Sequence, residues 1–174
     1  MKQITLVGAS ANDYEEYYKI RCCPSDVYWN GYNSKPDKDK FFSLFLERTA
    51  DSRFELPEDR RIYLVKQIEA DDLNITVGFI QFIMRENAVE IGYSVMEEYQ
   101  GQGIATKALK FAVSLAQEYS PYVIVRIRDD NIASQHVAQK CGFRRSDRFI
   151  LKQYPKAGMV RLRTYVYSQN NDML

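Results

Sequence analysis

Two different periods of apolar residues meet near the middle of the chain. Between positions 89 and 95, apolar residues alternate with Glu90, Gly92 and Ser94, which is the period of a half-buried strand. From Ile104 to Tyr119 they recur with the spacing of an amphipathic helix. A glycine-containing segment separates the two, so the pattern predicts a strand, a short loop and a helix in direct succession.

The same reasoning predicts the other elements. Strands are expected at 2–8, 61–68, 75–84, 122–128, 143–151 and 160–168, and helices at 13–21, 38–48 and between Asn131 and Gly142. Pro24 should end the helix at 13–21. Short turns join the strands at 61–68, 75–84 and 89–95, which predicts an antiparallel meander.

The strands at 89–95 and 122–128 flank the central helix and should form one right-handed βαβ unit. We therefore expect a single α/β (α+β) domain over residues 1–168, with a strongly bent mixed sheet and a C-terminal hairpin. A polar tail at 169–174 should be frayed.

The loop between the central strand and helix is the first segment that indicates chemistry. Unpaired N–H groups and the helix dipole make a helix N-terminus an anion site. Glycines let phosphate oxygens reach the main chain, where each charge-assisted bond contributes ~1.5–3 kcal/mol. An ordinary tight turn is the alternative. A dinucleotide-binding Gly-x-Gly-x-x-Gly/Ala pattern does not fit, because position 106 is Thr.

Gln100-x-x-Gly103-x-Ala105, after an alternating strand, resembles the signature of the GNAT superfamily of acetyl-CoA-dependent N-acetyltransferases. The resemblance implies that this loop binds the pyrophosphate of coenzyme A. The segment Asn131-Ile132-Ala133-Ser134, followed by Gly142-Phe143, resembles the family's helix beside the pantetheine arm, and is closest to the branch that acetylates ribosomal-protein N-termini. The coenzyme contacts implied are Val95, Gln100, Gly101, Gln102, Gly103, Ile104, Ala105, Thr106 and Asn131.

The resemblance also implies catalytic residues. A Glu on the matching strand acts as a base in several relatives, which makes Glu90 the candidate base; an ion-paired strand residue is the alternative. Many relatives carry a Tyr four places before the Gly-Phe pair, but this chain has Ala138. Ser134 is therefore the candidate acid, with helix packing as its alternative. Trp29 and Tyr32, in an aromatic loop at 27–33, are expected to line the acceptor site or to cover the core.

Composition narrows the class of protein. The 174 residues carry 24 Lys+Arg against 23 Asp+Glu, a net charge of +1 that makes no case for nucleic acid or an anionic membrane as partner. Three cysteines and no signal peptide indicate a reducing cytoplasm. No apolar run approaches a membrane span, and one histidine with scattered cysteines predicts no metal site.

We therefore expect an N-acetyltransferase that moves acetyl from acetyl-CoA to a primary amine by direct transfer in a ternary complex. The acceptor is open between a peptide or protein N-terminus, an amino sugar and a small polyamine, and a homodimer is compatible with the sequence. A catalytically idle acyl-CoA-binding module is the alternative. Arg126 and Arg128 share one face of their strand, Arg161 and Arg163 share one face of theirs, and all four should point outward. If either pair instead borders the acceptor, an anionic substrate such as a nucleotide-linked amino sugar becomes attractive.

Overall fold

The computed structural model describes residues 3–68 and 74–168. Its strands form a seven-stranded sheet in the order β1-β2-β3-β4-β5-β7-β6. Adjacent strands are antiparallel except for β4 and β5, which are parallel. The strands are β1 (Gln3–Gly8), β2 (Arg60–Ile68), β3 (Asn74–Met84), β4 (Val89–Val95), β5 (Tyr122–Arg128), β6 (Arg144–Tyr154) and β7 (Gly158–Ser168).

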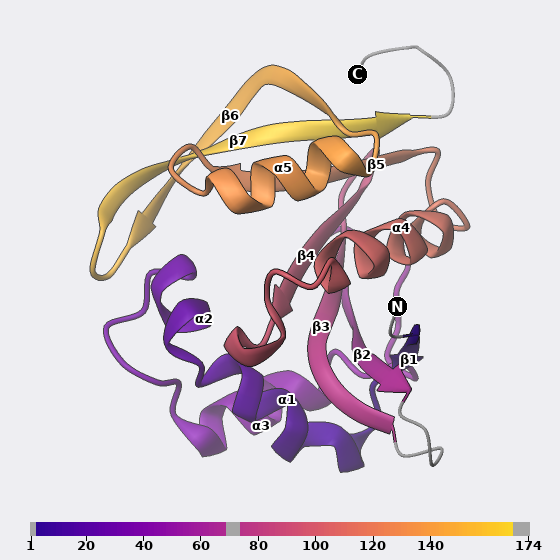
Figure 1. The fold of residues 1–174 in the computed structure, drawn as a ribbon, viewed down its shortest axis with the longest axis vertical. Helices are drawn as coiled ribbons and strands as arrows, with labels where there is room; N and C mark the ends of the chain where they lie inside the picture. Colours follow the sequence, from indigo (N-terminus) through magenta and orange to yellow (C-terminus); the bar gives the residue numbers. More distant parts are fainter. Residues whose placement is uncertain (1–2, 69–73, 169–174) are drawn as a thin grey trace.

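Helices cover both faces of this sheet (Figure 1). The α-helices are α1 (Tyr14–Arg21), α2 (Pro24–Trp29), α3 (Lys38–Leu46), α4 (Ile104–Ala116) and α5 (Ile132–Lys140). Two short 3₁₀ segments are η1 (Ala11–Asp13) and η2 (Glu97–Tyr99). The single mixed-sheet domain, the meander and the C-terminal hairpin are confirmed.

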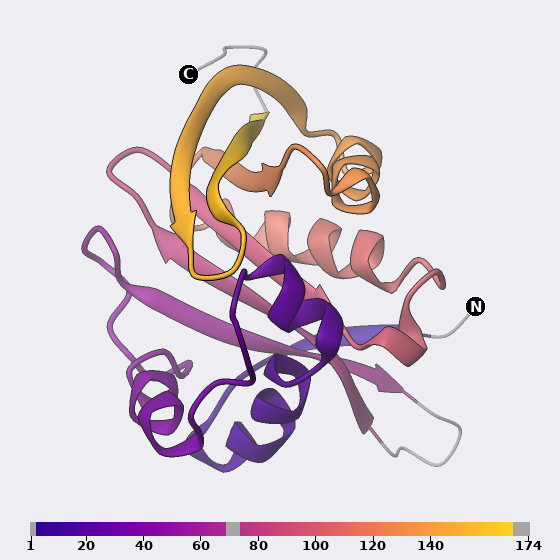
Figure 2. The ribbon, with the colours of Figure 1, turned by 90° about the vertical axis from the view of Figure 1, so that its left-hand side faces the viewer.

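Alternating side chains of the central strands divide the core into two clusters. On β2, Leu64 joins an aromatic cluster with α1 and α3, and Val65 joins the larger cluster that includes α4. Figure 2 shows α1 and α3 on one side of the sheet and α4 and α5 on the other. Strands covered on both faces are apolar on both faces, as β2 and β3 are here.

The parallel pair separates soon after it begins. Its recorded register covers only Val89 with Val123 and Glu90 with Ile124. Beyond these positions β4 and β5 diverge toward their carboxyl ends, and the helices α2 and α5 lie near the opening (Figure 1). The divergence leaves room for a site between two strands that would otherwise be hydrogen-bonded.

The aromatic segment after Pro24 corrects one expectation. Pro24 does end α1, but it also occupies the first turn of α2, where its missing N–H costs nothing. The Ser25 N–H, in the same turn, donates to the Glu97 carboxylate at 2.7 Å. Trp29 is therefore a helical residue, whereas the expected loop began at position 27. Tyr32 follows Gly31, whose φ of +66° forms the turn after the helix.

Other boundaries moved by a few residues. The central helix ends at Ala116, earlier than expected, and the closing hairpin is longer than predicted, with β6 reaching Tyr154. The polar tail at 169–174 and most of the turn before β3 lie outside the described residues. Within the described ranges, no helix combines the length and the apolar character needed to cross a bilayer.

Both ends of α5 follow the sequence signals. Asn131 is the N-cap, and its Oδ1 accepts from the Ser134 N–H at 3.0 Å. Gly142 has a φ of +88° and donates to the Gln139 carbonyl at 3.0 Å, while the Phe143 N–H donates to the Ala138 carbonyl at 3.1 Å. This is a Schellman C-cap. The two caps fix α5 beside the opening between β4 and β5.

Candidate functional site

The glycine loop forms the N-terminus of α4. Gly101 and Gly103 have φ values of +72° and +76°, and a Cβ added at either position would meet no atom within 4 Å. The first intrahelical bond of α4 runs from the Lys107 N–H to the Gly103 carbonyl at 3.1 Å, so the N–H groups of the preceding turn have no intrahelical acceptor. The loop can therefore approach a phosphate closely.

A cavity of about 410 Å³, here called the loop cavity, lies against this turn. Of the coenzyme contacts expected from the sequence, Gln102 is not in its lining: its side chain is exposed and donates to the Glu98 carbonyl at 3.1 Å. The other expected residues all line it: Val95, Gln100, Gly101, Gly103, Ile104, Ala105, Thr106 and Asn131. The residues present therefore fit a phosphate-bearing ligand of the size of coenzyme A's reactive end.

Gln100 also has a structural role. Its Nε2 donates to the Val95 carbonyl at 2.9 Å and lies 3.4 Å from Ser25 Oγ. The side chain thus joins the glycine loop both to the end of β4 and to the first turn of α2. With the bond from Ser25 to Glu97, this holds α2 over the loop cavity.

A second cavity of about 170 Å³, here called the strand cavity, occupies the opening between β4 and β5. Trp29 lines both cavities, whereas Tyr32 is absent from both linings and accepts a hydrogen bond from Arg21 Nη2 at 3.3 Å. The candidate acid Ser134 also borders both. The residues shared by the two linings are Asp26, Trp29, Asn30, Tyr93, Asn131 and Ser134. A group held in one cavity can thus meet a group held in the other.

Asp26 is the main residue that the sequence analysis missed. It is 3% exposed and lies in the first turn of α2, on the lining of both cavities. Its Oδ1 accepts from Arg21 Nη1 at 3.3 Å, and Arg21 is 6% exposed. Burial raises the pKa of Asp26, while Arg21, Ser94 and Asn30 oppose that rise. A raised pKa in a cleft is typical of a functional carboxylate.

Several polar atoms around the strand cavity are buried without a hydrogen-bond partner in the described part of the chain. They are Arg21 Nε, Asp26 Oδ2, Gln81 Nε2 and Arg126 Nε. Asp26 Oδ2 lies 3.2 Å from Arg21 Nη1, but without hydrogen-bond geometry. Each such atom costs ~1–3 kcal/mol when left unsatisfied. Their concentration around one cavity indicates a site for a polar ligand.

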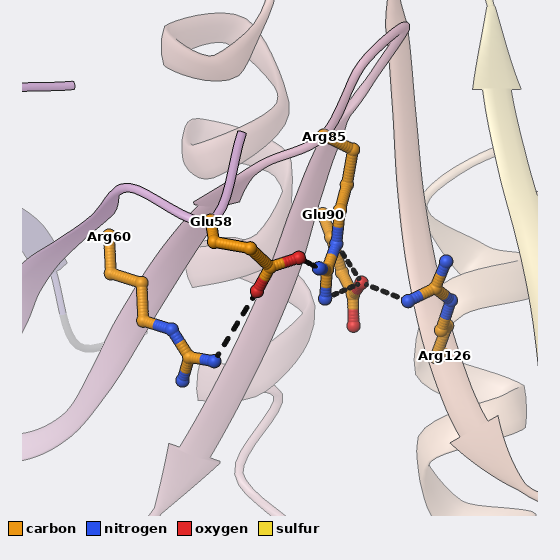
Figure 3. Close-up of polar contacts among 5 residues, drawn as sticks. All are labelled: Glu58, Arg60, Arg85, Glu90 and Arg126. Atoms are coloured by element: carbon orange, nitrogen blue, oxygen red, sulfur yellow. Dashed lines mark hydrogen bonds and ion pairs between the residues drawn. The ribbon is translucent and has the colours of Figure 1, made fainter. Parts of the chain in front are cut away.

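Glu90, the candidate base, lies in a chain of charges that Figure 3 shows. Its Oε2 accepts from Arg85 Nε at 2.8 Å and from Arg126 Nη1 at 2.8 Å. Arg85 also contacts Glu58, which lies 3.8 Å from Arg60 Nη2. Glu90 is absent from the linings of both cavities. Glu90 is thus one member of an ion-pair network, which is the alternative to its catalytic role that the sequence left open.

The expectation that Arg126 and Arg128 point outward was wrong, since both line the strand cavity. Arg128 donates to both carboxylate oxygens of Asp130, at 2.9 and 2.7 Å. Its guanidinium also lies over the Trp29 and Tyr154 rings, 5.1 and 5.9 Å from their centroids. Arg128 is therefore a fixed wall of the cavity, with its charge already compensated.

Among the residues that the structure describes, no three His, Cys, Asp or Glu side chains gather where they could hold an ion. Cys22 and Cys23, adjacent at the end of α1, are both free thiols.

Solved structures with this fold support the assignment of the architecture. A Vibrio cholerae spermidine N-acetyltransferase in complex with CoA and spermine aligns with a TM-score of 0.76 at 15% identity, over 96% of each chain. An aminoglycoside acetyltransferase in complex with coenzyme A gives 0.72 at 13% identity, over 96% of this chain and 95% of the other. A Bacillus anthracis acetyltransferase of the GNAT family gives 0.71 at 18% identity, over 97% and 98%.

The two sequence comparisons gave different results. A search of curated proteins returns no match. The family model for the acetyltransferase (GNAT) domain matches residues 3–144, which include the glycine loop, α5 and the strands β4 and β5 that flank the strand cavity. The chain therefore belongs to the GNAT family of acetyltransferases.

Proposed function

We propose that this protein transfers acetyl from acetyl-CoA to a primary amine by direct attack in a ternary complex. The observation that carries the proposal is the pair of adjoining cavities. The loop cavity ends at an α-helix N-terminus suited to a pyrophosphate. The strand cavity adjoins it, because six residues line both cavities. Acetyl-CoA in the loop cavity supplies an activated acetyl group, and the amine enters from the strand cavity.

The reaction needs two proton movements. The amine nitrogen bonds to the acetyl carbon as the carbon–sulfur bond breaks, and the nitrogen, which arrives as ammonium, loses two protons. One proton goes to the departing sulfur and the other passes to a carboxylate and then to solvent. Ser134 remains our sequence-based candidate for the donor to sulfur, and its place on both linings supports that role.

Two carboxylates are candidates for the proton acceptor. Glu90 follows from the family resemblance, but its Oε2 is shared by Arg85 and Arg126. Asp26 borders both cavities, and burial raises its pKa. We therefore propose Asp26 as the base and Glu90 as the residue that positions Arg126.

The size of each contribution indicates what a variant should lose. Holding the amine and the thioester together lowers the activation free energy by ~7–11 kcal/mol. A positioned acid or base contributes ~10²–10⁴-fold in rate, which is about 3–5.5 kcal/mol. Turnover therefore depends first on the two cavities, and the absence of a Tyr at position 138 is compatible with activity.

Asp26→Asn and Glu90→Gln distinguish the two carboxylates. We expect Asp26→Asn to lower kcat/KM by ~10²–10⁴ with the acetyl-CoA affinity unchanged, because Asn still accepts a hydrogen bond but not a proton. Asp39→Asn is the matched control, since Asp39 is an exposed carboxylate in the first turn of α3. A loss confined to Glu90→Gln, with recovery at high pH where more amine is neutral, would assign the base to Glu90.

The measurements are calorimetric titration with acetyl-CoA and release of free CoA thiol in the presence of an amine library. Amines that bring about CoA release are confirmed by mass spectrometry of the acetylated product. The resemblance to the branch acting on ribosomal-protein N-termini makes a peptide α-amine one member of that library. Binding of acetyl-CoA without release for any amine would favour the idle acyl-CoA-binding module.

A further inference from the structure

The strand cavity is unbalanced in its hydrogen-bonding groups. Arg21 Nε, Gln81 Nε2 and Arg126 Nε are buried donors that lack partners in the described ranges. Asp26 Oδ2 is a buried acceptor that accepts no hydrogen bond there, although it lies 3.2 Å from Arg21 Nη1 in an ion pair. Donors in that arrangement require a ligand group that only accepts hydrogen bonds, and the aspartate oxygen requires a ligand group that donates.

The ion-pair chain that reaches the cavity through Arg126 carries a positive surplus. Figure 3 shows a chain in which Glu58 and Glu90 alternate with Arg60, Arg85 and Arg126. Each of the two carboxylates is shared between two guanidinium groups, so this row of ion pairs holds one more positive than negative charge. Arg126 lies at the end of the row and lines the strand cavity.

Lys152 is an exposed lysine beside the cavity wall, with its Nζ 5.1 Å from the centroid of the Tyr154 ring, which lines the cavity.

The arginines that line the cavity differ in what they can still bind. Arg128 is occupied, because its Nε and Nη2 donate to Asp130 and its Nη1 lies 3.5 Å from the Tyr28 carbonyl. Arg126 makes its recorded bond through Nη1 alone and keeps a buried, unpartnered Nε. Of these two arginines, Arg126 is therefore the one better placed to receive an anion.

We propose that the amine acceptor also carries an oxyanion, a phosphate or a carboxylate. Arg126, assisted by Gln81 and Arg21, binds the oxyanion in the strand cavity, while the amino group lies at Asp26. This inference rests on the proposed acetyltransferase function and names the class of its acceptor.

The cavity volume limits the part of the acceptor that is enclosed. About 170 Å³ is close to the ~150 Å³ of an apolar cavity that holds benzene, so the enclosed part is small. Amine and oxyanion should therefore be joined by a short linker. A polyamine would place further ammonium groups against the arginines of the cavity. In this respect the chain should differ from the V. cholerae neighbour at 15% identity, which is named as a spermidine N-acetyltransferase. We expect this chain to discriminate against spermidine.

Matched small amines test the inference on the full chain with CoA present. O-phosphoethanolamine and β-alanine carry a phosphate and a carboxylate, respectively; ethanolamine and propylamine carry neither, and spermidine is the cationic comparison. Trp29 is the only tryptophan of the protein and lines both cavities, so its fluorescence reports binding directly. CoA release with acetyl-CoA measures turnover of the same compounds.

We expect at least one oxyanion amine to bind at least about tenfold more tightly than its neutral counterpart, which is ~1.4 kcal/mol. Arg126→Gln should abolish that difference. Arg53→Gln, which removes the same charge from an exposed arginine outside both linings, should retain it. Because the effect is ionic, added salt should reduce it. The stronger of the two oxyanion amines identifies phosphate or carboxylate as the preferred group.

Equal affinity for charged and neutral amines, preference for spermidine, or no binding of either oxyanion amine up to millimolar concentration would overturn the inference. A difference that survives in Arg126→Gln would also overturn it, by placing the anion elsewhere. In each case turnover of any amine would leave the acetyltransferase proposal intact. The acetyltransferase proposal itself would fail in a different way: the wild-type protein would either not bind acetyl-CoA or bind it without releasing CoA with any amine.

Discussion

Gly103→Val in the glycine loop should have two effects that can be measured separately: lower stability and weaker acetyl-CoA binding. Gly103 has a φ of +76° at the N-cap of α4, a conformation that costs an L-residue ~1–2 kcal/mol. No protein atom lies within 4 Å of the position that a Cβ would take. The folded protein can therefore accommodate the side chain, and the methyl groups enter the loop cavity instead.

The two consequences have different sizes and different assays. Backbone strain of ~1–2 kcal/mol lowers the melting temperature by about 2–8 °C in a domain of this size. Filling the space beside the helix N-terminus should weaken acetyl-CoA binding more than about tenfold, or ~1.4 kcal/mol, in calorimetric titration. The variant should remain folded at the temperature of the titration.

Gly158 provides the matched control for this experiment. It begins β7 with a φ of +70°, a Cβ there also meets no atom within 4 Å, and it lines neither cavity. Gly158→Val should thus cost a similar amount of stability and leave the acetyl-CoA affinity unchanged. An acetyl-CoA affinity that is unchanged in both variants, or weakened equally in both, would refute the assignment of the loop to the coenzyme.

Other expected outcomes follow from the same structure. Ser134→Ala should lower kcat with little change in acetyl-CoA Kd, and turnover at the parent rate would reduce Ser134 to packing. Ala138 is fully buried, so Ala138→Tyr should cost ~1–3 kcal/mol or more in thermal melts and is a poor rescue of Ser134→Ala. Gly142→Ala should lower the melting temperature, because φ is +88° and its Cβ would lie 3.3 Å from Tyr167. Because burial raises the pKa of Asp26, the acid limb of kcat/KM should lie above the ordinary aspartate value of ~3.9, and Asp26→Asn should remove that limb.

Local signals explain which parts of the site could be predicted from sequence. The change from period two to a helical period located the glycine loop, and the loop's residues line a cavity at the start of α4. Asn131 has a side chain that suits a helix N-cap and Gly142 has the backbone freedom that suits a helix C-cap, and both are found at the ends of α5. These features depend on neighbours close in the chain, which a sequence displays directly.

The short helix α2 lacked such a signal. Its six residues, Pro24–Trp29, make less than two turns, which is too few for a hydrophobic period to be recognised. Asp26 therefore appeared as one acidic residue among many. Its importance comes from burial beside Arg21 and from its interaction with Ser94 of β4, both of which depend on how α2 packs across the sheet.

The contrast between Glu90 and Asp26 follows from where β4 and β5 separate. Alternation shows which residues share a face of a strand, but in a sheet covered on both sides it does not show which face borders a ligand. Glu90 lies opposite Ile124 at the last recorded pair of the parallel register, so its carboxylate remains close to β5 and meets Arg126. Farther along, the strands diverge, and α2 brings Asp26 to the opening. The same divergence exposes Arg126 to the strand cavity. The point of separation therefore gives Glu90 an ion-pair partner and leaves Asp26 as the carboxylate at the junction of the two cavities.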